Sequence, residues 1–192
     1  MARHDEVEIK FVVHDVKALE QSLAANGFQL KTPPTFETNT LYDLPNQQLR
    51  RRGELLRLRL YGDKWKLTHK SKGVAARHKT RVEHETTVGD GERMHSILTA
   101  LGYSPSFVYE KFRSEWNDGR GEVVIDRTPI GDIAEIEGSP RWIDQTAKKL
   151  GVVREDYITQ SYAEMFFAWK RRTKSKAQNM TFKECGKRKP KF

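Results

Sequence analysis

The sequence has one cysteine, Cys185, and no long hydrophobic run. A single thiol cannot form an internal disulfide, and Cys185 is far from any group of histidines, so we expect a reducing compartment and no cysteine-based metal site. The N-terminal residues form no apolar leader, and no apolar run approaches the length that crosses a membrane. We therefore expect a soluble, cytoplasmic protein without a membrane partner.

Several common catalytic signatures are also missing. The six histidines do not have the HExxH spacing of a zinc site. The chain offers no Ser-His-Asp arrangement and no glycine-rich phosphate loop.

Charge is unevenly distributed along the 192 residues. Residues 170–192 contain ten Lys and Arg and one acid, so they account for the formal charge of +9, and residues 1–169 are neutral. The length suits one domain with an appendage. We expect a domain over 1–169 and a basic C-terminal tail over 170–192 that is solvated and disordered. Weak docking of this tail on RNA, polyphosphate or an anionic surface is the alternative.

Most of the chain alternates with the period of a β-strand. The eight alternating segments are 6–13, 35–43, 54–61, 64–70, 80–88, 107–116, 122–127 and 131–138. Helical spacing of apolar residues indicates four helices, at about 16–26, 92–101, 142–150 and 159–169. We expect flexible connections at 45–53 and 71–79. Successive strands of this kind predict an α+β protein with an antiparallel sheet or barrel and flanking helices.

The charged residues gather on one face of the predicted strands. Glu6, Glu8 and Lys10 share one face of the first strand. Val7 and Ile9 share the other face. An open antiparallel sheet with one wet face would give the same alternation. However, the polar positions are nearly all ionised, and like charges are adjacent, which destabilises a sheet without a counter-ion. This pattern favours a closed barrel whose charged interior encloses a polyanion and divalent cations.

Residues 6–10 (EVEIK) match an E-x-E-x-K signature, and with the later segments they resemble the CYTH domains, the triphosphate tunnel metalloenzymes. The later segments follow in the family's order: LRLR at 56–59, KLTHK at 66–70, RVEHE at 81–85, EKFR at 110–113, Asp126, GDIAEIE at 131–137 and Ser161-Tyr162. The resemblance extends to about residue 169. One departure is that Ser71 and Lys72 precede Gly73, where family members often place a glycine turn directly after the strand.

The resemblance implies an eight-stranded antiparallel β-barrel that forms a tunnel, with helices packed outside. Family members are inorganic triphosphatases, thiamine triphosphatases, RNA triphosphatases and class IV adenylyl cyclases, and they use Mg²⁺ or Mn²⁺. We therefore expect one of these cations as the cofactor and a small-molecule triphosphate as the substrate.

Two sets of side chains are the candidate site. Bases suit phosphate, since Arg binds it through two hydrogen bonds and Lys provides a mobile point charge. The candidate triphosphate-binding bases are Lys10, Arg57, Arg59, Lys66, Lys70, Arg81, Lys111 and Arg113. The candidate metal-binding acids are Glu6, Glu8, Asp126, Glu135 and Glu137, with Glu83 and Glu85 as second choices. For any single base, a salt bridge to an acid of the tunnel is the alternative role.

Roles within this set follow from the resemblance. Glu135 and Glu137 with Asp126 would hold the metal that binds the triphosphate. Glu6 and Glu8 would place a second metal or the attacking water, and Mg²⁺ prefers such oxygen ligands. Lys10 would either orient the nucleophile, act as its base, or bind phosphate. Glu6, Glu8 and Lys10 are thus the candidate catalytic residues.

Three functions remain open from the sequence. The first is a metal-dependent hydrolase of inorganic triphosphate, thiamine triphosphate or a nucleoside triphosphate. The second is a class IV adenylyl cyclase, which would convert ATP to cyclic AMP and pyrophosphate. The third is a non-catalytic module that binds polyphosphate or RNA, although such a module would not need so many acids. The sequence is compatible with a monomer or a homodimer.

Overall fold

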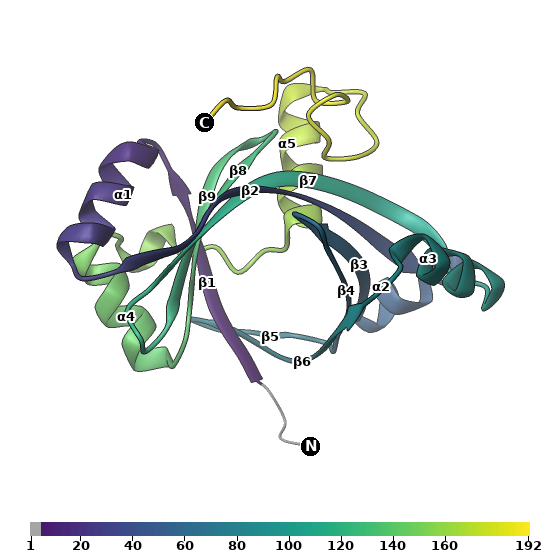
Figure 1. The fold of residues 1–192 in the computed structure, drawn as a ribbon, viewed down its shortest axis with the longest axis horizontal. Helices are drawn as coiled ribbons and strands as arrows, with labels where there is room; N and C mark the ends of the chain where they lie inside the picture. The colour runs from purple at the N-terminus through teal and green to yellow at the C-terminus, as the bar shows by residue number, and fades with distance from the viewer. Residues whose placement is uncertain (1–4) are drawn as a thin grey trace.

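Eight strands close into an antiparallel barrel in this computed structural model, which describes residues 5–192 (Figure 1). The strands neighbour one another in the order β1-β9-β8-β7-β2-β3-β4-β6, and β6 also pairs with β1. Their bounds are β1 (Asp5–Val13), β2 (Gln29–Asp43), β3 (Leu55–Tyr61), β4 (Lys64–Lys70), β6 (Lys79–Val88), β7 (Ser104–Asn117), β8 (Glu122–Thr128) and β9 (Gly131–Glu137). The predicted α+β barrel with flanking helices is confirmed.

The register directs the charged positions inward. In the pairing of β1 with β9, Lys10 is opposite Glu135 and Ile9 is opposite Ile136. Ile9 and Ile136 are fully buried in an apolar cluster. Since neighbouring residues of a strand point to opposite faces, the outer face of the barrel carries the hydrophobic contacts and the inner face carries the ions.

Two helices cover the outer face of β1, β8 and β9. These are α1 (Val16–Ala25) and α4 (Pro140–Lys149), which lie on the same side of the barrel in Figure 1. Asp15 caps α1, accepting a hydrogen bond from the backbone N–H of Ala18 at 3.0 Å. Leu23 of α1 and Ile143 of α4 are fully buried against the strands. This packing forms the largest apolar core.

A smaller core lies on the outside of β3 and β4. Here α3 (Gly91–Ala100) packs Leu98 against Leu58 of β3. Gly91 allows this contact, because a Cβ at that position would lie 2.0 Å from the ring of Trp65. The helix therefore begins at the only residue type that fits against this indole.

Helix α5 (Tyr162–Thr173) and the C-terminal segment pack together beside β7 (Figure 1). Ser161 and Glu164 form a capping box at the start of α5. Phe166 of α5 and Met180 of the C-terminal segment are both fully buried in one cluster with Phe107. The basic tail is thus joined to the barrel by apolar packing, and its first four residues lie within α5.

The prediction that the tail is solvated and disordered is wrong. Met180 donates a backbone hydrogen bond to the carbonyl of Val108, and its own carbonyl accepts one from Glu110, each at 3.0 Å. This part of β7 has an open edge because β8 pairs with β7 only from Phe112 onward. The C-terminal segment fills that edge, while its charged side chains remain at the surface.

The two connections that we expected to be flexible contain regular structure. The first holds a 3₁₀ turn (Pro45–Gln47) and α2 (Gln48–Arg52), and the second holds β5 (Val74–Ala75), which pairs with β6 outside the barrel ring. Strand β2 begins at Gln29, six residues before the predicted start. Among the described residues, no helix has both the length and the apolar character to cross a membrane.

Candidate active site

The interior of the barrel is a cavity of about 1380 Å³ lined by charged side chains. All eight predicted bases line it: Lys10, Arg57, Arg59, Lys66, Lys70, Arg81, Lys111 and Arg113. The predicted acids that line it are Glu6, Glu8, Glu83, Glu85, Glu135 and Glu137. Asp126 is fully buried behind this lining. The strands therefore bring the predicted residues together around one space.

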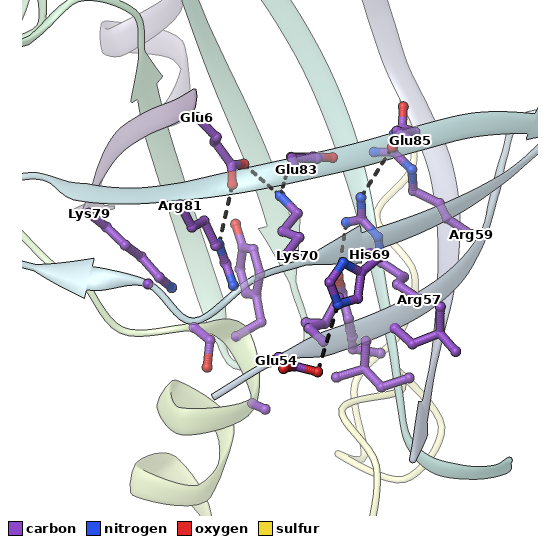
Figure 2. A pocket seen from close by; sticks show the side chains of 18 of the residues that line it. Glu6, Glu54, Arg57, Arg59, His69, Lys70, Lys79, Arg81, Glu83 and Glu85 are labelled. Carbon is purple, nitrogen blue, oxygen red and sulfur yellow. Dashed lines mark hydrogen bonds and ion pairs between the residues drawn. The ribbon is translucent and has the colours of Figure 1, made fainter. Parts of the chain in front are cut away.

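Lys70 and Arg81 contact the same carboxylate on one side of the cavity (Figure 2). Lys70 Nζ lies 2.6 Å from Glu6 Oε1 and 2.7 Å from Glu83 Oε2. Arg81 Nε donates to the other oxygen of Glu6 at 3.3 Å. Glu6 thus holds two cations from strands β4 and β6 at the inner surface.

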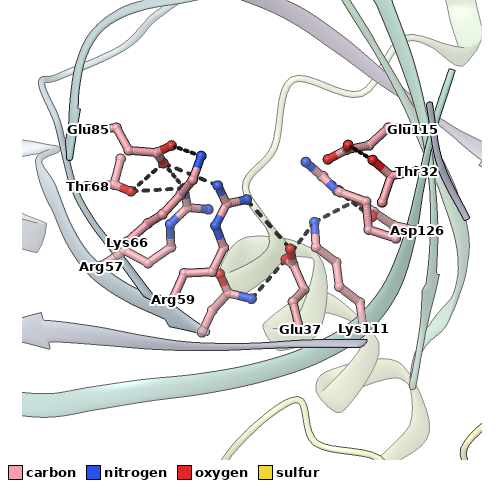
Figure 3. A network of polar contacts seen from close by, with 12 residues as sticks. Thr32, Glu37, Arg57, Arg59, Lys66, Thr68, Glu85, Lys111, Glu115 and Asp126 are labelled. Carbon is pink, nitrogen blue, oxygen red and sulfur yellow. Dashed lines mark hydrogen bonds and ion pairs between the residues drawn. The ribbon is translucent and has the colours of Figure 1, made fainter. Parts of the chain in front are cut away.

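Glu85 organises a second group, on β3, β4 and β6 (Figure 3). It accepts hydrogen bonds from Lys66 at 2.6 Å, from Thr68 at 2.8 Å and from Arg59 at 3.2 Å. Burial alone would raise the pKa of Glu85, but the bond from Lys66 and the charge of Arg59 lower it to about 2. Glu85 is therefore ionised and fixes the bases around it.

Lys10 lies between two acids. Its Nζ is 2.7 Å from Glu8 Oε2 and 3.2 Å from Glu135 Oε1. Burial alone would lower the pKa of Lys10, but the charges of Glu135 and Glu8 raise it above its ordinary value. Lys10 therefore carries its proton in this arrangement, as a phosphate ligand would.

Hydrogen-bond donors from three side chains surround the carboxylate of Asp126. Its carboxylate accepts from Lys111 at 2.7 Å, from Arg113 at 2.8 and 2.6 Å, and from the hydroxyl of Tyr162. It does not line the cavity. In this geometry Asp126 positions two of the cavity bases, and a role as metal ligand stays a prediction.

Several charged residues in and around the cavity were not predicted. Glu37 is fully buried, with carboxylate oxygens 3.3 Å from Lys111 Nζ and 3.6 Å from Arg59 (Figure 3). Burial opposes its ionisation, but the nearby bases, Lys111 first, lower the pKa of Glu37 to about 2. The sequence signal for Glu37 was that it shares one face of the predicted strand 35–43 with Asn39. Glu115, Glu122 and Lys79 line the cavity, whereas Glu37 is not among its lining residues.

Lys79 is a buried interior lysine that is only weakly paired. Its Nζ lies 3.9 Å from Glu8 Oε1 and the side chain is buried. Burial, followed by the charges of Arg81 and Lys10, lowers the pKa of Lys79 to about 8. The predicted strand began one residue later, which is why this position was missed.

The acids on β1 and β9 have the properties expected of cation ligands. Burial and then the charges of Glu6 and Glu135 raise the pKa of Glu137 to about 8. Glu8 Oε1 is buried and has no hydrogen-bond partner among the described residues. In residues 5–192, no group of three or more His, Cys, Asp or Glu side chains is arranged to hold a metal ion. Mg²⁺ usually takes one or two carboxylates and completes its shell with water and substrate phosphate, so Glu8 and Glu137 fit such an ion.

The comparison with known proteins agrees with this geometry. A protein of Methanocaldococcus jannaschii named "Putative adenylate cyclase" is 25% identical over 171 residues, which is 83% of this chain and 97% of the relative. A solved structure from Vibrio parahaemolyticus, described with the same name, matches at 21% identity with a TM-score of 0.76, covering 86% of this chain and 99% of that one.

A second solved structure has the same fold. The structure of a "putative adenylyl cyclase" from Hippeastrum, described as having a dominant triphosphatase activity, matches at 19% identity with a TM-score of 0.63. It covers 85% of this chain and 95% of that one. The family model of the CYTH domain matches residues 4–162. The chain therefore belongs to the CYTH domain family.

Proposed function

We propose that this protein is a metal-dependent triphosphate phosphohydrolase that acts on inorganic triphosphate or on an organic triphosphate. The observation that carries the proposal is the barrel interior, in which bases from five strands face one cavity with Glu8 and Glu137 beside them. A triphosphate is a compact anion that such a cavity can surround.

The bases of the cavity would bind the phosphate oxygens. A pair of unit charges 4 Å apart is worth about 4 kcal/mol at an effective dielectric constant near 20. In the absence of ligand the bases are paired with acids, as Lys10 is with Glu8 and Glu135. An entering triphosphate would share these cations, so the bases are already held in position when it arrives.

A divalent cation would be held by Glu8 and Glu137. When bound, Mg²⁺ or Mn²⁺ neutralises phosphate charge, which supports an in-line phosphoryl transfer. Lys10 contacts Glu8 and Glu135 and would bind phosphate through its protonated amine. Lys111 and Arg113, oriented by Asp126, would also bind the anion, and Arg113 contacts the same Glu135 as Lys10.

The second candidate is an adenylyl cyclase, and the names of the Methanocaldococcus and Vibrio proteins favour it. The same bases would bind ATP, and the ribose hydroxyl would attack the α-phosphorus. The activity described for the Hippeastrum protein favours the hydrolase. The two reactions differ in which phosphorus faces the nucleophile, so product analysis separates them.

The test is an assay of phosphate release from inorganic triphosphate, thiamine triphosphate and ATP beside an assay of cyclic AMP, with Mg²⁺ and with Mn²⁺. We expect phosphate release and no cyclic AMP. The variants Glu8→Gln and Glu137→Gln should retain anion binding and lose turnover. Glu155→Gln, at an exposed position, is the matched control. Turnover that survives both cavity substitutions would contradict the proposed metal ligands, and cyclic AMP as the main product would contradict the hydrolase.

A further inference from the structure

A second, smaller cavity, which is largely open to solvent, lies beside the barrel interior and is lined by residues of α2, of α5 and of the chain directly after α5. Its volume is about 520 Å³. The residues that line it are Arg50, Phe167, Lys170, Arg171, Lys174 and Ser175. Four of the six are bases and none is an acid, so this space is suited to an anion.

The two cavities meet at Arg50 and Phe167, which line both of them. The guanidinium carbon of Arg50 lies 5.3 Å from the centre of the Phe167 ring, which is a cation–π contact. A chain of phosphates that leaves the barrel interior at this point would enter the second cavity directly.

The position of Arg50 is fixed by the chain before it. The carboxylate of Asp43 accepts hydrogen bonds from the backbone N–H groups of Leu49 at 2.8 Å and Arg50 at 3.1 Å. The preceding turn places Asn46 and Gln47 in the left-handed region, with φ of 62° and 56°. Non-glycine residues adopt this conformation at a cost of about 1–3 kcal/mol each. The backbone thus holds α2 at the end of β2, and Arg50 of α2 reaches Phe167 of α5 through its side chain.

The bases of the second cavity are not neutralised as those of the barrel are. None of the four has a carboxylate within 4.0 Å among the described residues, whereas Lys10 and Lys111 each contact two. Lys170 Nζ instead donates to the amide oxygen of Gln178 at 3.5 Å. The barrel interior therefore balances its charges internally, and the second cavity has a surplus of positive charge.

We propose that the second cavity binds the phosphate groups that follow a triphosphate held in the barrel, so that linear polyphosphates of more than three phosphates belong to the ligands of this protein. This inference rests on the proposed function, which places the triphosphate in the barrel. A nucleoside fits this position less well, because four of the lining residues are cations and the aromatic ring is already in contact with Arg50. A phosphate chain meets complementary charge throughout.

The test compares two double substitutions that remove the same charges. Lys170→Gln with Arg171→Gln alters the second cavity, and Lys187→Gln with Arg188→Gln alters exposed tail positions that line neither cavity. Each protein is assayed with inorganic triphosphate, and a linear polyphosphate of about fifteen phosphates is added as an inhibitor. We expect the first pair to raise the inhibition constant about tenfold, as for the loss of two charge contacts. The Michaelis constant for triphosphate should stay within about twofold in both.

Equal inhibition constants in wild type and the first pair would overturn the inference and leave the proposed function standing. An equal rise in both pairs would also overturn it, because general attraction by the basic tail would then explain binding. If the wild type does not hydrolyse triphosphate, the proposed function fails. Calorimetric titration with the same polyphosphate then tests the cavity alone, with weaker binding to the first pair as the supporting result and equal binding as the opposing one.

Discussion

Glu137 of β9 lies directly opposite Glu8 of β1 in the register of the barrel. Two acids at paired positions on the same face repel each other when both are ionised. Burial and the neighbouring acids, Glu6 before Glu135, raise the pKa of Glu137 to about 8. Without a cation, the carboxyl group of Glu137 therefore keeps its proton near neutral pH. A proton and a cation compete for the carboxylate of Glu137.

The first prediction concerns stability and pH. The ordinary pKa of Glu137 is 4.5 and the folded value is about 8. Between these values the folded protein binds a proton that the unfolded chain has lost, so stability falls as pH rises, by up to about 1.4 kcal/mol per pH unit. Denaturant unfolding without divalent cations should show this decline between pH 5 and 8. Glu137→Gln should reduce the decline and exposed Glu155→Gln should not; equal slopes in all three proteins would contradict the shifted pKa.

The second prediction concerns cation binding. Mg²⁺ or Mn²⁺ at the carboxylates of Glu8 and Glu137 should displace the proton of Glu137, releasing about one proton per cation near pH 7. Calorimetry in two buffers with different ionisation enthalpies measures this number. The cation should also raise the melting temperature by mass action. Glu8→Gln should weaken binding and Glu137→Gln should abolish the proton release. Cation binding without proton release by the wild type would place the ion elsewhere.

Strand alternation predicted the inward residues because a period of two assigns each side chain to a face. Alternation placed Glu6, Glu8 and Lys10 on one face, and the adjacent like charges together with the resemblance to CYTH domains indicated that this face is the interior. Glu37 was missed because its segment carries no second acid at the next inward position, where Asn39 stands. The alternation also could not show that Asp126 would be covered by Lys111, Arg113 and Tyr162, since these partners come from other strands and from α5.

The order of the C-terminal tail could not be predicted, for a different physical reason. Its composition is that of a disordered segment, with ten bases in 23 residues. Its order depends on Met180 and Phe182, two apolar residues whose partners on β7 are about 70 residues earlier in the chain. An unpaired strand edge is a long-range feature that no local pattern reports.

The third prediction distinguishes two bases of the cavity by how much each contributes to stability. Lys111 is buried and contacts both Asp126 and Glu37, so Lys111→Met leaves two buried carboxylates short of a partner. We expect a loss of about 3–5 kcal/mol in the free energy of unfolding. The side chain of Lys66 is 33% exposed and pairs with Glu85, so Lys66→Met should cost no more than about 1 kcal/mol. It should nevertheless raise the Michaelis constant for triphosphate. Urea unfolding and steady-state kinetics measure both; equal destabilisation by the two substitutions would contradict this division.

The fourth prediction concerns the C-terminal segment. Met180 is fully buried between α5 and β7, so Met180→Ala removes packing that the surrounding side chains can only partly recover. We expect a loss of about 2–5 kcal/mol in the free energy of unfolding. Lys176→Ala, at an exposed position of the same segment, should change it by less than about 0.5 kcal/mol. Truncation after Thr173 should destabilise the protein further, because it also exposes the backbone groups of Val108 and Glu110. A truncated protein as stable as the full chain would show that the apolar contacts of Met180 and Phe182 contribute nothing in solution.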